Sequence, residues 1–224
     1  MSKILLVEAR LHLRDGASLL FTIALPLMLL VFLGRAAGPA FPALMVMLSV
    51  LTLSFTVLPT VLATYRHQGV LRRMSTTPVS PLRVLAVQLL INLVVAVVST
   101  GLLMAFGPGL PRNLPGFLLV FVLGTAALMA MGLVIAALAP NGKAAPTIGS
   151  AVMFPLMFVS GMWVPREYLP EVVRVIGDYS VAGPFARALG DTWVGQAPHL
   201  PHLLVLAVGL VVSGALAVRV FRWE

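Results

Sequence analysis

The sequence predicts an all-α integral membrane protein with six transmembrane helices, and three observations support this fold class. The 224 residues are 60% hydrophobic and only 10% charged. Their mean hydropathy is +1.05, and the charged fraction falls well short of the roughly 25% that a soluble domain carries. The charged residues also divide the chain into six long uncharged runs, which are 16–34, 36–65, 84–111, 113–142, 144–165 and 192–218.

Each uncharged run has the length of one membrane crossing. A helix needs about 20 residues to span a hydrocarbon core about 30 Å thick. No run is long enough for two helical crossings, and none alternates as a barrel strand does. Because unpaired backbone groups are too costly in lipid, we expect one domain over residues 1–224 that contains six helices. The expected spans are 16–34, 41–64, 82–106, 117–139, 144–164 and 199–220.

The segments outside the spans are short and have patterns of their own. In residues 3–15, Ile4, Val7 and Leu11 share one helical face and the charged residues lie elsewhere. This pattern predicts an amphipathic helix on the inner membrane surface, and a simple extension of the first span is the alternative. The outer segment 165–191 contains glycines and prolines that are expected to divide it into short pieces.

The placement of lysine and arginine predicts the orientation. One side of the membrane carries ten of them, which are Lys3, Arg10, Arg14, Arg66, Arg72, Arg73, Arg83, Lys143, Arg219 and Arg222. The other side carries five, which are Arg35, Arg112, Arg166, Arg174 and Arg187. Because the cytoplasmic side is the richer one, we expect a multi-pass plasma-membrane protein with both termini inside. The net charge of +8 then reflects topology, and no nucleic acid partner is expected.

The spans lack the groups that catalysis or ion coupling would need. Apart from Arg83 and Arg219, which stand at the ends of two spans, no Asp, Glu, Lys or Arg lies inside them, which argues against ion-coupled transport. The sequence has no cysteine and no G-x-S-x-G, H-E-x-x-H or phosphate-loop motif. His199 and His202 have no cysteine or acidic cluster near them in the sequence, so a helix-flanking role is favoured over metal binding. We therefore expect no catalytic residue, metal site or cofactor in this chain.

Uncharged polar residues mark two places within the spans. The candidates for a helix interface or a translocation path are Ser49, Thr52, Thr56, Thr60, Gln88 and Asn92. The first four share one face of the second span, and the last two are one turn apart in the third. Both roles remain open. Pro26, Pro59 and Pro155 lie inside spans, where each produces either a static kink or a moving hinge.

The largest cytoplasmic loop, 66–80, has the pattern of a short helix between two turns. Val70, Leu71 and Met74 can share one apolar side of this helix. Pro78 must end the helix, because the residue before a proline avoids the α region. Such a helix offers a surface that a cytoplasmic partner could grip.

Two motifs in the chain carry a resemblance to a known family. In the first, a Gly is followed by Leu-Arg-Arg and Thr-Pro-hydrophobic-Ser, at Gly69, 71–73 and 77–80. In the second, a proline-containing span runs into Ser-Gly, a hydrophobic pair, Pro and later Leu-Pro. Its residues are Pro155, Ser160, Gly161, Pro165, Leu169 and Pro170. The sequence thereby resembles the ABC-2 family of ABC-transporter membrane subunits, especially the drug-export type similar to daunorubicin-resistance permeases.

The resemblance implies an amino-terminal elbow helix, a coupling helix in the first cytoplasmic loop, and short outer re-entrant helices before the sixth span. It also implies two permeases, either two copies or a homologous pair, with two ABC ATPase subunits that bind ATP and Mg. The implied coupling residues are Arg66, His67, Gly69, Val70, Leu71, Arg72, Arg73, Met74, Thr77 and Pro78. The implied re-entrant region contains Ser160, Gly161, Pro165, Leu169 and Pro170.

Three functions are compatible with these features. The first is the membrane subunit of an ATP-driven exporter for lipophilic or amphipathic compounds, such as drugs or antibiotics, which works by alternating access. The second is an export permease for a polysaccharide or a lipid-linked glycan, which should have a wider polar or aromatic-lined channel. The third is a membrane anchor or assembly protein that transports nothing and needs no ATPase. The aliphatic composition of the spans favours the first function.

Overall fold

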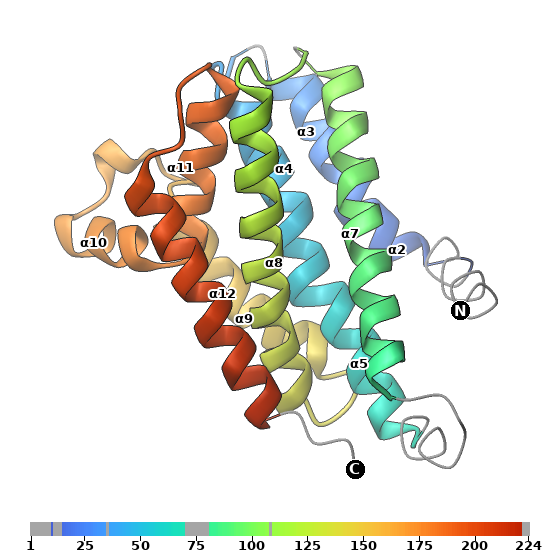
Figure 1. The fold of residues 1–224 in the computed structure, drawn as a ribbon. Coiled ribbons are helices and arrows are strands. Elements are labelled where there is room, and N and C mark those ends of the chain that lie inside the picture. The colour runs from blue at the N-terminus through green and yellow to red at the C-terminus, as the bar shows by residue number, and fades with distance from the viewer. Residues whose placement is uncertain (1–9, 11–14, 35, 70–80, 108, 221–224) are drawn as a thin grey trace.

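The computed structural model describes residues 10, 15–34, 36–69, 81–107 and 109–220, and the regular structure within these ranges is helical (Figure 1). The elements are α2 (Gly16–Leu19), η1 (Leu20–Ala24), α3 (Leu25–Leu33), α4 (Phe41–Thr52), η2 (Leu53–Val57), α5 (Leu58–His67), α7 (Pro81–Phe106), α8 (Leu114–Leu138), α9 (Ala145–Val159), η3 (Arg166–Tyr168), α10 (Glu171–Tyr179), α11 (Ala182–Trp193) and α12 (Leu200–Val220). Elements η1 and η2 are π-helical and η3 is a 3-10 helix. We call α2–η1–α3 span 1 and α4–η2–α5 span 2. The all-α prediction is confirmed.

Five helical segments are long and apolar enough to cross a membrane. They are Gly16–Leu33, Phe41–His67, Arg83–Phe106, Leu114–Leu138 and Leu200–Val220. The expected fifth span, 144–164, corresponds to α9, whose 15 residues reach only about 22 Å. The sixth crossing therefore stays a prediction, while the other five have the required length.

Helix α9 is short because a glycine turn stops it. Gly161 has a φ of +84°, in the left-handed region that glycine adopts without strain. The amide of Met162 donates to the carbonyl of Met157, and the amide of Gly161 donates to the carbonyl of Phe158. These two bonds form a Schellman motif, which ends an α-helix at this point.

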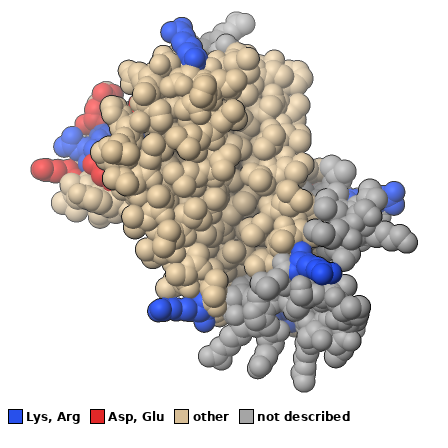
Figure 2. Space-filling model, in the orientation of Figure 1, with Lys and Arg blue, Asp and Glu red and all other residues tan. Residues whose placement is uncertain are grey.

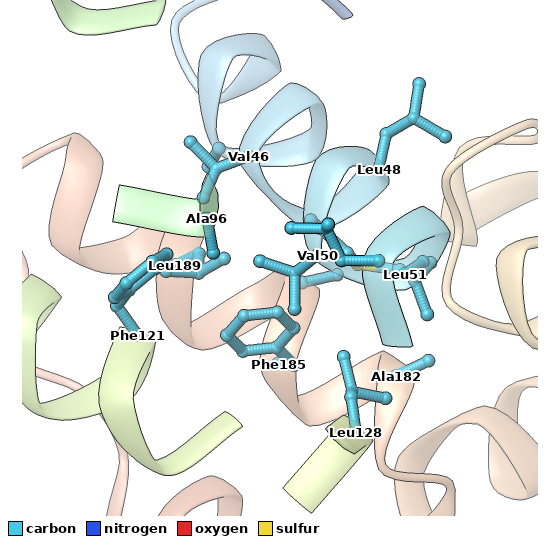
Figure 3. Close-up of a cluster of buried hydrophobic side chains, with 14 of the residues drawn as sticks. Val46, Leu48, Val50, Leu51, Ala96, Phe121, Leu128, Ala182, Phe185 and Leu189 are labelled. Atoms are coloured by element: carbon cyan, nitrogen blue, oxygen red, sulfur yellow. The ribbon is translucent and has the colours of Figure 1, made fainter. Parts of the chain in front are cut away.

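Span 2 occupies the centre of the bundle. In its most apolar window 83% of the residues are buried, against 17% for span 1 and 11% for α12. Figure 3 shows the core around it, where side chains from α4 meet side chains from α7, α8 and α11. The labelled core residues are Val46, Leu48, Val50, Leu51, Ala96, Phe121, Leu128, Ala182, Phe185 and Leu189. Span 1, α7, α8 and α9 pack around this central helix, whereas α12 packs on α8 and α11.

Two short helices, α10 and α11, precede α12. Pro170 lies directly before α10, as the proline pattern predicts. However, Gly177 lies inside α10 and Gly183 lies inside α11, so these two glycines do not separate pieces of the segment. A β-carbon on Gly177 would lie 2.2 Å from the carbonyl oxygen of Val159. The glycine therefore allows α10 to rest directly on the end of α9.

On the face shown in Figure 2, the charged side chains of the described residues lie at the borders of the bundle. In the face shown in Figure 2, lysine and arginine lie near the helix ends, and a mixed group of acidic and basic residues lies beside α10. Two expected features fall outside the described residues, apart from Arg10 and Asp15 of the first. They are the amphipathic helix over 3–15 and the part of the coupling loop that contains Val70, Leu71, Arg72, Arg73, Met74, Thr77 and Pro78.

Candidate functional site

A large groove lies between span 1, span 2 and α9. It has a volume of about 810 Å³. On span 2 its lining extends from Phe41 to Val61, a rise of about 30 Å at 1.5 Å per residue. This length equals the thickness of a bilayer's hydrocarbon core, so the groove is long enough to extend across a membrane.

The groove wall is apolar and adaptable. Aromatic and methionine side chains are prominent in it, namely Phe21, Phe41, Phe154, Trp163, Met45, Met153, Met157 and Met162. Methionine is flexible and polarisable, so it can pack against ligands of different shapes. Of the described lining residues, only Asp15 at the start of span 1 is charged. Such a wall suits a ligand that is largely lipophilic.

Three threonines of span 2 line the groove at intervals of four residues. These are Thr52, Thr56 and Thr60. The hydroxyl of Thr52 donates to the carbonyl of Leu48 at 2.9 Å, and the hydroxyl of Thr60 donates to the carbonyl of Thr56. The donors of Thr52 and Thr60 are thus used within the helix, while their oxygen lone pairs can still accept hydrogen bonds. This stripe can orient a polar group of a ligand within an otherwise apolar groove.

The other polar candidates pack between helices. Ser49 donates to the carbonyl of Met45 at 3.2 Å, and its oxygen lies 3.0 Å from the hydroxyl oxygen of Ser99. The side-chain amide of Asn92 donates to the carbonyl of Gln88 at 2.8 Å. Ser49, Gln88 and Asn92 are buried and are not part of the groove lining. The structure therefore divides the polar set into a groove group and an interface group.

Spans 1 and 2 share a local irregularity where they line the groove. In each span a five-residue π-helix comes directly before a Leu-Pro pair, at η1 before Pro26 and at η2 before Pro59. Pro26 has no N–H for the carbonyl of Thr22 four residues earlier. The hydroxyl of Ser99 on α7 donates to that carbonyl instead, at 3.1 Å. A neighbouring helix thus satisfies the backbone group that the proline leaves unpaired.

The second proline is accommodated by glycines. Pro59 cannot donate to the carbonyls of Ser54 and Phe55, which lie five and four residues before it. A β-carbon on Gly132 of α8 would lie 1.9 Å from the Ser54 oxygen, and one on Gly149 of α9 would lie 1.7 Å from the Phe55 oxygen. Only glycine at these two positions lets α8 and α9 approach span 2 so closely.

The described part of the expected coupling loop lies at the C-terminal end of span 2. Arg66 is partly buried, and its guanidinium donates to the carbonyls of Ala136 and Ala137 at 3.1 and 2.8 Å, and also to the carbonyl of Ala139. His67 is exposed. Arg66 thus bonds to the end of α8 within the chain itself, a contact that the sequence pattern did not indicate.

The expected re-entrant residues form the turns that join α9, η3 and α10. Ser160 and Gly161 follow α9, and the Ser160 hydroxyl donates to the Met157 carbonyl at 2.8 Å. Pro165 precedes η3 and Pro170 precedes α10. Leu169 between them is buried. These residues shape the outer segment, and its depth in the membrane stays a prediction.

A cluster of charges, which the sequence pattern did not identify, fastens this outer segment. Asp178 on α10 accepts a hydrogen bond from Arg166 at 2.7 Å and another from Arg187 on α11. The hydrogen bond from Arg166 holds the pKa of the Asp178 carboxyl below its ordinary value, and the nearby charge of Arg187 acts in the same direction. Arg187 also donates to the ring of His202 at 3.2 Å. Three elements are thereby tied to α12.

A second cavity of about 340 Å³ lies beside these charges. Its lining includes Ser160, Gly161, Arg166, Arg187 and Asp191. Two residues of the second sequence motif and two arginines of the charge cluster therefore meet at one place. The signal that could have revealed this was the presence of opposite charges in a segment that is otherwise apolar.

Comparison with known proteins decides the family. A family described as ABC-2 family transporter protein matches residues 34–219. The chain belongs to the ABC-2 transporter family. No curated protein and no solved structure matches the chain. As an ABC-2 permease, the chain is a multi-pass membrane subunit of an ABC transporter and works with an ABC ATPase subunit. The matched range begins after span 1, so it includes two of the three walls of the groove.

Proposed function

We propose that this ABC-2 permease exports lipophilic or amphipathic compounds, and that the groove between span 1, span 2 and α9 forms the wall of the path. The observation that carries the proposal is the apolar groove itself, about 810 Å³ in volume, with a stripe of three threonines. An apolar wall gains free energy by removing lipophilic surface from water. The threonine oxygens supply the few polar contacts that orient an amphipathic ligand.

Energy comes from the partner in this proposal. The sequence has no phosphate loop, so ATP and Mg are bound by the ABC ATPase subunit. That subunit docks on the coupling loop over 66–80, where Leu71 and its apolar neighbours enter a groove of the partner, and Arg72 and Arg73 pair with acidic residues at the rim. A second copy, or a homologous permease, faces the open side of the groove and completes the path.

The glycan alternative is supported less well. Long sugars require a wide path lined with many polar groups, whereas most of the residues that line this groove are apolar. The anchor alternative gives no role to a groove that extends about 30 Å along span 2. Drug or antibiotic efflux across the plasma membrane is therefore the function that we favour.

The test is reconstitution of the chain with its cognate ABC ATPase in lipid vesicles. We expect lipophilic cations and neutral amphiphiles to stimulate ATP hydrolysis and to be transported in an ATP-dependent way, whereas glycans do neither. Stimulation by glycans alone would favour the second function. A purified pair that never associates would favour the anchor.

The absence of cysteine allows a clean test of orientation. Tyr179 is 79% exposed on α10, and His67 is exposed at the other end of the bundle. In intact cells an impermeant thiol reagent should label Tyr179→Cys and leave His67→Cys unlabelled. The opposite pattern would reverse the proposed topology and remove the coupling loop from the cytoplasm.

A further inference from the structure

Arg66 acts as a cap on a helix that is remote in sequence. Its guanidinium donates to three backbone carbonyls, those of Ala136, Ala137 and Ala139, which lie 70 to 73 residues away. The last carbonyls of an α-helix have no partner within the helix and carry the negative end of its dipole. A planar cationic fork with five N–H donors fits this end better than any other side chain.

The sequence explains why α8 needs an external donor. Position 140, four residues after Ala136, is a proline and has no N–H for the Ala136 carbonyl. Ala136 and Ala139 are both fully buried, so water is a poor substitute. Arg66 therefore occupies a position that the chain cannot fill from within α8.

A second contact holds the loop that follows α8 against the last turn of span 2, next to Arg66. A β-carbon on Gly142 would lie 1.8 Å from the hydroxyl oxygen of Thr64 and 3.0 Å from its β-carbon. Ala63, Ala139 and Ala145 also form one buried cluster. The loop that leads from α8 into α9 is thus held against the last turn of span 2 by both the arginine and close packing.

These contacts join the part of the chain that precedes the coupling loop to a wall of the groove. Helix α9 begins at Ala145, only three residues after Gly142, and its residues from Pro146 to Met157 line the groove. Span 1, the opposite wall, packs on span 2 and α7 and is much less buried. The inner ends of span 2, α8 and α9 can therefore move as one body, while span 1 is free to separate from them.

We propose that Arg66 is a positioning residue that transmits motion from the coupling loop to α8 and α9. When the ATPase displaces residues 66–80, the arginine carries the inner ends of α8 and α9 with span 2, and the groove widens against span 1. The inference rests on the proposed function and adds which helices move when the groove opens. It also gives Arg66 a role inside the permease rather than in the partner contact.

The test compares Arg66→Ala with Arg219→Ala, which removes an exposed arginine from the inner end of α12. In the complex with the ATPase, Arg66→Ala should reduce substrate-stimulated ATP hydrolysis and export by about tenfold, a typical size for a coupling residue. The membrane level should stay within about twofold of that of Arg219→Ala. Arg66→Lys keeps the charge but lacks the planar guanidinium. Its stimulated hydrolysis and export should therefore lie between those of Arg66→Ala and Arg219→Ala. Normal export by Arg66→Ala would overturn the proposal.

A reversible tether separates transmission from simple stability. On the Arg66→Ala background, Thr64→Cys and Gly142→Cys place two β-carbons 3.0 Å apart. This is shorter than the roughly 3.5 to 4.5 Å of a disulfide, so the bond forms after an outward shift of about half an ångström. Oxidation should restore stimulated hydrolysis and export, and reduction should abolish them again. Loss of the remaining export on oxidation would show that span 2 and α9 must separate, and it would refute the rigid-body inference.

A measurement on the chain alone keeps failure of this inference distinct from failure of the proposed function. Hydrogen exchange over residues 139–145 should be faster in Arg66→Ala than in Arg219→Ala without any partner present. Equal exchange in the two variants would contradict the proposed cap. Exchange could be faster in Arg66→Ala while no substrate stimulates ATP hydrolysis by the wild-type complex. That result would refute the exporter function and would still support the Arg66 cap.

Discussion

The two sides of span 2 differ in what separates them from their neighbours. On one side, Gly132 and Gly149 bring α8 and α9 against the backbone carbonyls of Ser54 and Phe55, with no side chain between. On the other side, Thr52, Thr56 and Thr60 face an open groove. The packed side is limited by backbone contact, whereas the groove side has empty volume. The same helix therefore provides a fixed scaffold and a variable wall.

The π-helix η2 explains how one helix can serve both purposes. Pro59 leaves two carbonyls without a donor, and they lie on the side that the glycines cover. Such π-helical turns and prolines bend a helix and often mark functional positions. Substitutions on the packed side should therefore affect folding, and substitutions on the groove side should affect transport.

The largest effect is expected for Gly149→Val. Its side chain would overlap the Phe55 carbonyl, since even a β-carbon would lie 1.7 Å from that oxygen. We expect a loss of about 3 kcal/mol or more in the free energy of unfolding, seen as a low membrane level and a lower melting temperature in detergent. Gly214→Val is the matched control on α12, because a β-carbon there meets no atom within 4 Å. Equal behaviour of the two variants would remove the distinction between the sides.

Thr56→Phe on the groove side should impair transport and leave stability nearly unchanged, unlike Gly149→Val, which should impair stability. The larger ring can enter the open volume, so the melting temperature should change little. Export should fall by about tenfold, because the path loses the room for its ligand. Export assays and thermal unfolding on the same preparation test this prediction. A variant that unfolds yet transports normally when rescued by low temperature would contradict it.

Thr125→Val on α8 should stabilise the protein, by less than Gly149→Val destabilises it. The Thr125 hydroxyl is buried and has no hydrogen-bond partner, so replacing it with a methyl group should raise the free energy of unfolding by about 1 kcal/mol. Thr52→Val is the matched control, because the Thr52 hydroxyl is bonded to Leu48 and lines the groove. It should leave stability nearly unchanged and should raise the substrate concentration that half-saturates export. Lower stability of Thr125→Val would argue against the packed interior described above.

The smallest effect is expected from low pH, which should loosen α10. This helix lies on neither the packed side nor the groove side of span 2. The pKa of Asp178 lies below its ordinary value of 3.8, chiefly because Arg166 donates to its carboxylate. The stabilisation is therefore complete at neutral pH and is lost as the pH falls below that ordinary value through the lowered pKa. After correction for the intrinsic pH dependence of amide exchange, hydrogen exchange over residues 171–179 should rise by about threefold on acidification and stay constant over span 2. Asp178→Asn should lack this pH dependence, and a pH effect that persists in it would place the titrating group elsewhere.

Much of the fold can be predicted from the spacing of charges. The interval between Arg35 and Arg66 indicates span 2. Arg83, in the first turn of α7, and Arg112, beyond its end, indicate the third span. This works because burying a charge in lipid is costly for any sequence. The length of α9 could not be predicted in the same way, since the uncharged run continues past Gly161 while the helix does not. The loop motif likewise indicates the family, because it is a local pattern that can be read along the chain.

The candidate site was only partly predictable. Threonines at intervals of four residues indicated a polar face on span 2, but Ser49 on the same face is covered by α7 while Thr56 is open. Periodicity places residues on one side of a helix and does not identify the neighbour on that side. The charge cluster around Asp178 depends in the same way on the positions of η3, α10 and α11.

The sequence by itself determined the membrane class, the order of the spans and the family, because these depend on hydropathy and local motifs that act along the chain. Only the tertiary structure decided which hydroxyls face the groove, which glycines receive the carbonyls of span 2, and where Arg66 donates. Each of these is a contact between helices far apart in sequence, and its geometry depends on how the whole bundle packs. The Arg66 cap on α8 joins positions 70 or more residues apart, and no local pattern records such a pairing.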